Sequence, residues 1–321
     1  MLTAILLGFA LDAAPTCSPA QVQALTQVTA QPYRLTCRAA LQGQNVTRPL
    51  LIEGREASGA GVDCGGGVIG RRDQPVTNAT PTVAIRSRRL TGQSWSAPTD
   101  VAFRNCTVFG MVRIFGMGAN YRSEDSRASS RRPGHTQRAR QAAPKRLAFD
   151  NVTFFATAGV PLYVGPGTTA LRVSDSHFLG HSTGTAIYLD AETAGNVIER
   201  TAFNLTTDGR EMIAVDGSAR NRIVRNSFDL AGRRGILLYR NCGEAGIIRH
   251  QTPSENVIED NVFTNARSSA EAVIVGSREG RQSFCDADAG YNLGSSADDG
   301  DHATGNIVRR NRVSTSGRGA R

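Results

Sequence analysis

The chain has 321 residues, 40% of them hydrophobic and 6% aromatic, with a formal net charge of +9 and Lys145 as the only lysine. This composition excludes disorder throughout the chain, and the length allows one elongated domain or two small ones. The arginine excess weakly favours a polyanionic partner, either a nucleic acid or an acidic polysaccharide.

The first 14 residues have an apolar core of signal-peptide length, with small residues near a possible cleavage point but no basic residue in front. We interpret residues 1–14 as a signal peptide, which predicts a secreted or periplasmic protein; a buried first strand or helix is the alternative. No later apolar run approaches the roughly 20 residues needed to span a bilayer. We expect an N-terminal cap over residues 15–50 and a tail at 316–321.

A repeat of about 25 residues runs through residues 51–315. One template carries a polar residue in a fixed place, at Asn105, Asn151, Asp175, Thr201, Asn226, Asn261 and Asn311. A second template follows about a dozen residues later, as in "AIYLDAE", "MIAVDGS" and "GILLYRN". Each copy of the second template alternates apolar and polar residues between glycine or serine, which is a strand signal. The two templates together predict at least two short strands in every repeat.

Short strands at this period predict a stacked solenoid in which each coil bonds to the next about 4.8 Å away. The recurring polar residues then form a buried ladder whose amides satisfy one another. On this repeat and ladder, residues 51–315 resemble the right-handed parallel β-helix proteins, the pectate-lyase-like superfold. The resemblance implies an all-β, single-stranded right-handed parallel β-helix with long loops over one face, but it does not fix a function.

Three insertions interrupt the repeat, at residues 118–146, 239–253 and 277–305. The first is basic and nearly devoid of apolar residues, which predicts an exposed, mobile arm. The other two leave after the same strand template, so they should emerge on one side of the rod. The first and third gaps could instead each hide a degenerate extra coil.

The six cysteines suit an oxidising compartment and lack the spacing of a zinc site. One cysteine in each of the last two insertions predicts a Cys242–Cys285 disulfide. Nearness predicts the pairs Cys17–Cys37 and Cys64–Cys106, although a reduced core pair is the alternative for the second.

The outward face of the second template carries the candidate chemistry. Its apolar positions point into the core, so Asp190, Asp216 and Tyr239 should face solvent on consecutive coils, with Glu192 beside them. Carboxylates about 4.8 Å apart repel each other, so an arginine, a cation or a shared proton must compensate. Tyr163 and Tyr188 would form an aromatic platform for a sugar ring next to these acids.

These residues suit a polysaccharide lyase, in which a base removes the proton beside a uronate carboxylate and β-elimination follows. The resemblance implies Ca²⁺, which Asp190, Glu192 and Asp216 would hold. Arg240 is the candidate base or carboxylate clamp, and Tyr239 or His250 the proton donor. The candidate substrate-binding residues are Tyr163, Tyr188, Arg86, Arg88, Arg113, Asn241, Glu244, Arg249 and Arg278.

Other readings stay open. In a glycoside hydrolase, Asp190 and Asp216 would be the carboxyl pair, with Glu192 as an alternate. A uronate epimerase would share the proton abstraction, but the motifs of polygalacturonase-like hydrolases and alginate epimerases are absent. A glycan-binding solenoid or adhesin is the non-enzyme alternative. The basic surface favours a lyase on an acidic polysaccharide or oligosaccharide, and the export signal and acidic centre disfavour nucleic acid.

Overall fold

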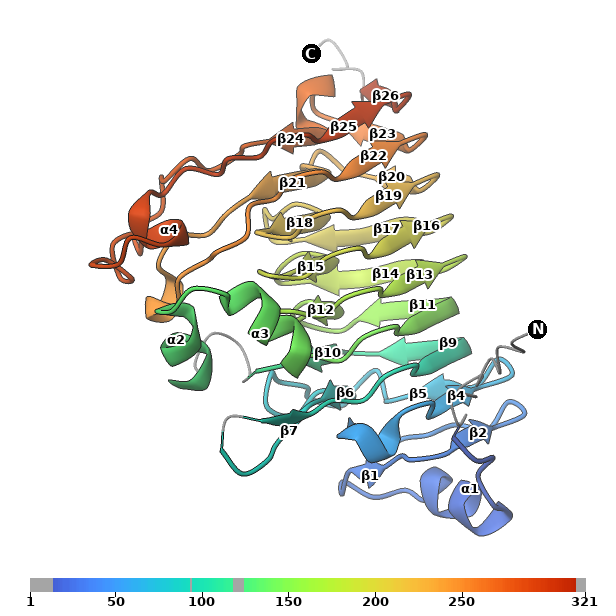
Figure 1. Ribbon diagram of the computed structural model, residues 1–321. Coiled ribbons are helices and arrows are strands. Elements are labelled where there is room, and N and C mark those ends of the chain that lie inside the picture. The colour runs from blue at the N-terminus through green and yellow to red at the C-terminus, as the bar shows by residue number, and fades with distance from the viewer. Residues whose placement is uncertain (1–13, 93, 118–123, 316–321) are drawn as a thin grey trace, which may run out of the picture.

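A computed structural model describes residues 14–92, 94–117 and 124–315 of the chain. In this part the backbone winds into a rod of stacked coils, a right-handed parallel β-helix (Figure 1). The predicted all-β solenoid is therefore confirmed. The segment interpreted as a signal peptide, except Ala14, and the expected tail lie outside the described residues.

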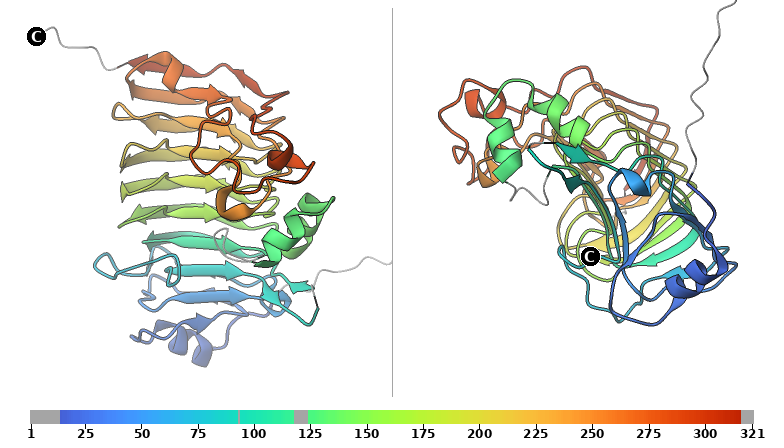
Figure 2. Two further views of the ribbon diagram at one scale, coloured as in Figure 1. Left: turned by 90° about the vertical axis from the view of Figure 1, so that its left-hand side faces the viewer. Right: turned by 60° about the horizontal axis from the view of Figure 1, so that its bottom comes forward.

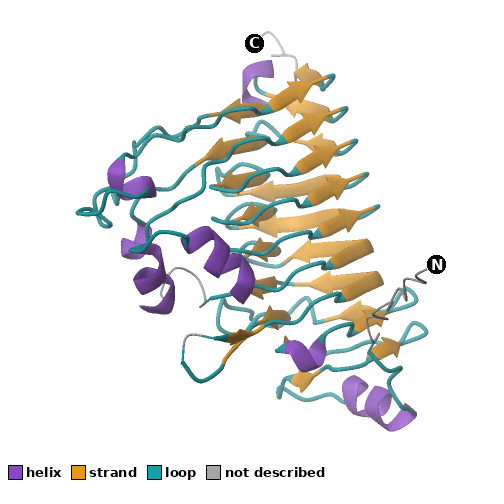
Figure 3. Ribbon diagram, viewed as in Figure 1, coloured by secondary structure: helices purple, strands orange, loops and turns teal. Residues whose placement is uncertain are grey.

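Two large sheets wrap around the core (Figure 3). The nine-stranded sheet runs in the order β1 (Tyr33–Arg34), β3 (Leu50–Glu53), β6 (Val83–Arg86), β10 (Val112–Phe115), β12 (Leu162–Val164), β15 (Ile187–Leu189), β18 (Ile213–Asp216), β21 (Ile236–Tyr239) and β24 (Val273–Val275). These are the strands of the second template, and their registers pair Tyr163 with Tyr188 and Asp216 with Tyr239 as predicted.

The fifteen-stranded sheet contains the strands of the first template and the corresponding strands of the N-terminal coils. It consists of β2 (Arg38–Ala40), β4 (Gly61–Asp63), β5 (Val68–Ile69), β9 (Ala102–Phe109), β11 (Ala148–Ala156), β13 (Arg172–Ser174), β14 (His177–Ser182), β16 (Val197–Glu199), β17 (Ala202–Thr207), β19 (Arg222–Val224), β20 (Ser227–Asp229), β22 (Val257–Glu259), β23 (Val262–Ala266), β25 (Ile307–Arg309) and β26 (Arg312–Thr315). A separate antiparallel hairpin joins β7 (Arg88–Arg89) to β8 (Trp95–Ser96).

A column of phenylalanines fills one side of the core because like residues stack from coil to coil. Successive ring centroids along this column lie 4.6, 4.8, 4.5 and 4.7 Å apart, in Phe154, Phe178, Phe203, Phe228 and Phe263. Each ring is at most 1% exposed. The opposite side of the core is filled by the inward Val, Ile and Leu residues of the nine-stranded sheet.

The predicted ladder exists in its C-terminal half. The Asn226 amide donates to Asn261 Oδ1 at 3.0 Å, and the Asn261 amide donates to Asn311 Oδ1 at 3.0 Å. The N-terminal half of the prediction is wrong by one residue, because Asn105 and Asn151 occupy left-handed positions within β9 and β11, with φ of 52°, and point out of the core. Asn105 is half-buried and Asn151 is exposed, although the Asn151 amide still donates to Asn105 Oδ1 at 2.8 Å. The inward column continues instead through Cys106, Val152, Ser176 and Thr201.

A second ladder, which the repeat analysis missed, lies at another corner of the coil. Asn196 donates to Asn221, Asn221 to Asn256 and Asn256 to Asn306, at 2.9, 2.8 and 3.0 Å between amide nitrogen and oxygen. The first three of these residues are fully buried. These amides therefore satisfy the backbone where each coil turns.

The described part of the first insertion, residues 124–146, is folded, which corrects the prediction of an exposed, mobile arm. It forms α2 (Glu124–Ser130) and α3 (His135–Ala142), which bury small or polar residues: Ser126, Ser129, Ser130, His135, Ala139 and Ala142. Serine and alanine allow close packing without an apolar stripe, so hydrophobic periodicity gave no signal. Strand β9 pairs directly with β11, and β22 with β25, so neither gap hides an extra coil.

The remaining elements are short. Helix α1 (Pro19–Thr26) lies at the N-terminal end of the rod and begins with a capping box at Ser18 (Figure 1). The others are η1 (Arg55–Ala57), η2 (Glu244–Gly246), η3 (Ser269–Glu271) and α4 (Gly294–Ala297). The structure contains the disulfides Cys17–Cys37, Cys64–Cys106 and Cys242–Cys285, the three pairs expected. No helix in the described residues is long and apolar enough to cross a membrane.

Candidate functional site

Three segments gather over one face of the nine-stranded sheet. Helices α2 and α3 and the two later insertions lie on the same side of the rod (Figure 2). The Cys242–Cys285 disulfide joins the later insertions to each other. The backbone N–H of Ile248 donates to Ser130 Oγ at 3.0 Å, which joins one of them to α2. We call these three segments together the lid.

The lid buries the acidic column, which corrects the prediction that these residues face solvent. Asp190, Glu192, Asp216 and Tyr239 are each 0% exposed. Their side chains point out of the coil, as the alternation predicts, but the lid covers them. A substrate in solution therefore has no direct access to these carboxylates.

Arg249 is the cation that compensates the two aspartates. Its guanidinium lies 2.7 Å from Asp190 Oδ1 and 3.7 Å from Asp216 Oδ2, and the residue is 1% exposed. It also lies 3.6 Å from Glu244 Oε2. Buried charges are tolerated only when they are paired and hydrogen-bonded, so this lid residue makes the acidic column compatible with folding.

The two aspartates orient the two tyrosines. The Tyr163 hydroxyl donates to Asp190 Oδ2, and the Tyr188 hydroxyl donates to Asp216 Oδ2 at 2.7 Å. The side-chain amide of Asn241 donates to the same Asp216 oxygen at 2.7 Å. The tyrosine rings lie 5.9 Å apart with a tilt of 34°. Buried acids thus fix the hydroxyls of an aromatic pair in which Tyr163 is buried and Tyr188 is half-buried.

The three carboxylates do not fit a calcium ion. Asp190 accepts from Tyr163, Arg249 and the Ala191 backbone. Both oxygens of Asp216 are likewise bonded to protein donors. Glu192 accepts from the Thr136 hydroxyl and from the His250 backbone N–H at 2.8 Å. Protein donors occupy every oxygen of these three carboxylates, so the mechanism proposed below does not involve calcium.

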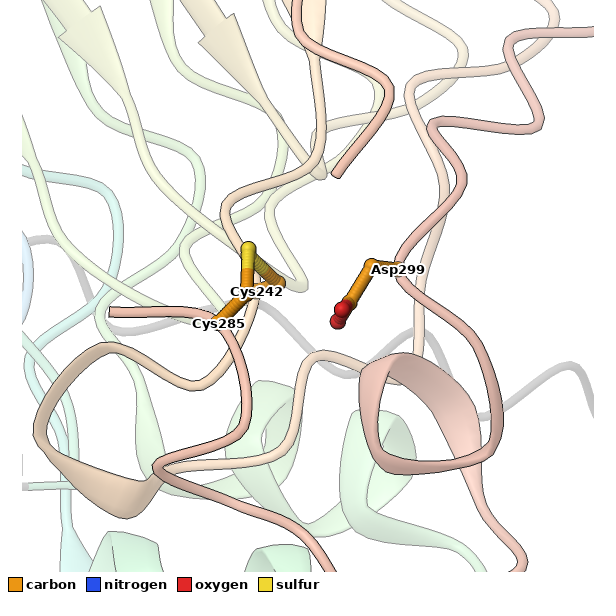
Figure 4. Close-up of side chains that lie close together, drawn as sticks. All are labelled: Cys242, Cys285 and Asp299. Carbon is orange, nitrogen blue, oxygen red and sulfur yellow. A yellow bond between two sulfur atoms is a disulfide. The ribbon is translucent and has the colours of Figure 1, made fainter. Parts of the chain in front are cut away.

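One further group of potential metal ligands lies close together among the described residues, namely Cys242, Cys285 and Asp299 (Figure 4). The two sulfurs of this group form the lid disulfide. Metal-binding cysteines are thiolates, which a disulfide lacks. This group therefore does not offer a metal site either.

A cavity of about 360 Å³ opens beside the tyrosines, and we call it the tyrosine cavity. Its lining includes three arginines, two tyrosines and one carboxylate residue. The lining residues are Asn78, Arg113, Val160, Tyr163, Thr185, Tyr188, Arg210, Asn241, Glu244, Arg278, Gln282 and Phe284. Six of the residues predicted to bind substrate therefore come together here, with Asp190 and Asp216 behind the tyrosines.

Glu244 is the carboxyl group of the tyrosine cavity. Burial raises its pKa, Arg249 opposes this increase, and the charges of Asp216 and Asp190 add to it, so that the pKa lies above the usual value. Its Oε2 atom accepts from the Asn241 amide at 3.2 Å. The side chain remains 34% exposed. Glu244 therefore keeps its proton to a higher pH than an ordinary glutamate and can exchange it with a ligand.

The arginines of the cavity are held by neighbouring side chains. Arg210 lies 2.8 Å from Glu211, and the Arg278 guanidinium lies 3.7 Å from the centre of the Tyr239 ring. Arg113 lies 5.0 Å from the centre of the Tyr163 ring and donates to Asn78. These contacts fix the directions of three guanidinium groups before any ligand arrives.

The sequence did not identify Arg210, Asn78 and Gln282 as residues of the site. Arg210 precedes β18 in a corner of the coil, outside both templates, and Asn78 and Gln282 lie in irregular segments. Arg210 forms an ion pair with its neighbour Glu211, and that pair contacts the hydroxyl of Tyr239. The adjacent charges of Arg210 and Glu211 were the one signal in the sequence, and such a pair does not indicate a cavity.

Besides Arg249 and the three buried acids, four more predicted residues do not line the tyrosine cavity. Arg86 pairs with Glu53 at 2.6 Å, and Arg88 pairs with Glu56, at an earlier part of the sheet. Arg240 donates to Asp298, 3.0 Å from its Oδ1 atom. The His250 imidazole contacts the Ser130 carbonyl oxygen at 2.6 Å. All four side chains connect segments of the protein, and the last two join parts of the lid.

Tyr239 is also outside the cavity wall. Burial and the nearby Glu211 charge raise its pKa well above the usual value, which favours the neutral phenol. Its hydroxyl donates to Glu211 Oε1 at 3.1 Å. The predicted role as proton donor to a substrate is therefore not supported by its surroundings.

The chain matches no protein-family model and no curated protein. Among solved structures it is similar to the Dettilon tailspike protein gp208, with 10% identity and a TM-score of 0.34 over 89% of this chain and 60% of the tailspike. It is also similar to a DFA-IIIase from Arthrobacter chlorophenolicus A6, with 13% identity and a TM-score of 0.30 over 92% and 78% of the two chains. A periplasmic alginate epimerase, AlgG, matches with 11% identity and a TM-score of 0.19 over 92% and 80%. The chain thus spans 60% of the length of the tailspike, and these scores are too low to assign a function.

Proposed function

We propose that this protein is an extracytoplasmic carbohydrate-active enzyme that cleaves an acidic, uronate-containing glycan by β-elimination. The observation that carries the proposal is the composition of the tyrosine cavity, which combines three guanidinium groups with two tyrosine hydroxyls and a single carboxyl group of raised pKa. Three disulfides support an oxidising, secreted or periplasmic location.

The arginines account for the acidic substrate. A guanidinium presents a planar fork of N–H donors that matches a carboxylate. Arg113, Arg210 and Arg278 would bind the uronate carboxylate and neutralise its charge. Neutralisation lowers the cost of removing the adjacent C5 proton, because negative charge develops on that carboxylate in the transition state.

Tyr188 is the proposed base. Its hydroxyl already donates to Asp216 at 2.7 Å, so the phenolic oxygen can accept the C5 proton while its own proton moves to Asp216. Glu244 would donate its proton to the leaving glycosidic oxygen. The C5–H and C4–O bonds break, the C4=C5 double bond forms, and the uronate becomes an unsaturated end.

The cavity favours this reaction over hydrolysis. A glycoside hydrolase requires two carboxyl groups beside the scissile bond. Among the described residues of the cavity wall, Glu244 is the only carboxylate residue, since Asp190 and Asp216 lie buried behind the tyrosines. An epimerase would use the same proton abstraction and return the proton to the other face of C5.

The test is the ultraviolet absorbance of unsaturated uronate ends, measured with a reducing-sugar assay on pectate, alginate and glycosaminoglycans. Both signals should rise together, and a chelator should not abolish them, because no step here uses calcium. Tyr188→Phe should lower the rate at least about a hundredfold. The matched control is Tyr33→Phe, in β1 at the N-terminal end of the rod.

Reducing ends without new absorbance would establish hydrolysis and refute β-elimination. A change of uronate configuration without cleavage, detected by NMR of the product, would identify an epimerase. Binding without any turnover would leave a glycan-binding protein.

A further inference from the structure

The last coil of the rod has an open outer edge, at the end marked C in Figure 1. Strand β25 pairs with β22 and β26 pairs with β23, and in the described chain neither has a partner on its other side. The turn η3 contacts β24 and β26, whereas Ile307 and Val308 of β25 remain 43% and 44% exposed. We call β25 and the flanking Asn306 and Asn311 the open edge.

We propose that the open edge binds an extended, acidic segment of another protein, which adds to the rod as one further parallel strand. An uncovered edge strand is a template for such pairing, because its outward N–H and C=O groups lack partners. None of the residues of the open edge lines the tyrosine cavity, so the inference does not depend on the proposed activity.

The apolar residues of the open edge fit an added strand. Val308 pairs with Ile258 and takes the inward position of its coil. Ile258 is 0% exposed because the last coil covers it, whereas Val308 is 44% exposed. The N-terminal end of the rod differs, since α1 lies over it and buries Leu25 completely (Figure 1). One further strand would bury Val308 as β25 buries Ile258.

The two asparagine ladders end at the open edge with unused donors. Inside the rod, the Asn261 amide donates both to the Ile223 carbonyl at 2.8 Å and to Asn311 Oδ1 at 3.0 Å. The Asn311 amide donates to the Ile258 carbonyl at 2.9 Å, but no next asparagine follows within the described residues. Asn306 likewise donates only to the carbonyl of Pro253, at 2.9 Å. An added segment with asparagines five residues apart would extend both ladders.

The charges of the rod indicate that the added segment is acidic. Glu259 lies between arginines of both neighbouring coils, 3.7 Å from Arg222 and 2.9 Å from Arg309. The last coil carries Arg309, Arg310 and Arg312, and no acidic residue occurs from position 306 onward. Arg312 is exposed, and its side chain forms no hydrogen bond or ion pair with the described residues. A carboxylate on the next strand would continue the alternation of acidic and basic coils.

Two occupants from this chain fit poorly. A second copy would bring its own Arg309, Arg310 and Arg312 against the same residues, or would present the end that α1 covers. Residues 316–321 read SGRGAR, with two arginines and neither an acidic nor a large apolar residue. Like charges at an edge disfavour both pairings, whereas an acidic strand meets opposite charge.

The probe for the test is a fluorescent peptide with the sequence SENVIEDNVF of residues 254–263, which stacks on a coil inside the rod and carries both asparagines and the acids. Anisotropy with the full-length protein should show saturable binding. Arginine in place of Glu259 and Asp260 of the peptide, or leucine in place of both asparagines, should weaken the affinity at least about tenfold. Val308→Glu in the protein should do the same, because it places an unpaired charge against the added strand. The matched control is Val28→Glu, an 81% exposed position beside α1.

Three results would overturn the inference. They are no binding of the acidic peptide, equal binding of its arginine form, or equal binding by the Val308→Glu and Val28→Glu variants. Sedimentation that shows a dimer which Val308→Glu dissociates would assign the open edge to a second copy instead. Thermal melts check the fold of both variants, and the peptide comparisons use the unaltered protein, so they decide even if Val308→Glu does not fold. No glycan enters these assays, so their outcome is separate from that of the lyase test.

Discussion

Replacement of Arg249 by methionine should destabilise the protein strongly. The guanidinium lies 2.7 Å from Asp190 and 3.7 Å from Asp216, and all three residues are at most 1% exposed. Removing one partner of a buried ion pair costs about 3–5 kcal/mol. Tyr163 and Tyr188 still donate to the two carboxylates, so we expect the lower end, about 3 kcal/mol.

The assay is equilibrium unfolding in urea at neutral pH. The matched control is Arg146→Met, because Arg146 forms two hydrogen bonds of 2.7 Å with Asp100 but has a side chain that is 45% exposed. That exposed pair should be worth less than about 1 kcal/mol. The double variant Arg249→Met, Asp190→Asn should recover part of the loss. Equal, small losses in the two arginine variants would refute the claim that Arg249 compensates the acidic column.

Three further predictions concern the cavity, the ladder and the lid. If Glu244 is the acid, the rate of unsaturated-end formation should fall as pH rises through its raised pKa, and Glu244→Gln should remove that limb of the pH–rate profile; an unchanged profile would exclude the role. Asn261→Leu should cost about 1–3 kcal/mol in urea unfolding, against less than about 0.5 kcal/mol for the exposed Asn204→Leu. Replacing Cys242 and Cys285 by serine opens a loop with a sequence separation of 43, which should cost about 4 kcal/mol, and a loss near zero would show that other contacts hold the lid.

The coil architecture could be predicted because one physical rule acts in every repeat. Each coil stacks on the next, so inward residues recur at a constant spacing, and the predicted partners Tyr163 and Tyr188 are true neighbours. The ladder error also has a physical cause. Asparagine suits both a buried ladder and a left-handed turn, so Asn151 resembles Asn226 in sequence although they occupy adjacent columns. The unequal steps of 24 and 26 residues around Asp175 mark the place where the alignment shifts by one.

The cover over the site could not be predicted in the same way. Alternation tells which side chains leave the coil, but it carries no information on what lies above them. Asp190 and Asp216 therefore looked exposed, although Arg249 from a loop far along the chain buries them. Helix α3 escaped detection because its buried face uses His135 and alanines rather than a hydrophobic stripe. Side chains of irregular segments, such as Asn78, have no period at all.

The lid has a consequence for the order of folding. Its parts are residues 124–142, 239–253 and 277–305. They meet over strands that lie between and before them in the sequence. Coils can add one after another through contacts with their neighbours alone. The lid, in contrast, requires that residues more than a hundred positions apart meet on a surface that already exists, and such long-range closure is slow. A chain that emerges with most of its coils complete would still lack Arg249 over its acids and Glu244 in its cavity. The lid and the tyrosine cavity should therefore be completed later than the coils that lie beneath them.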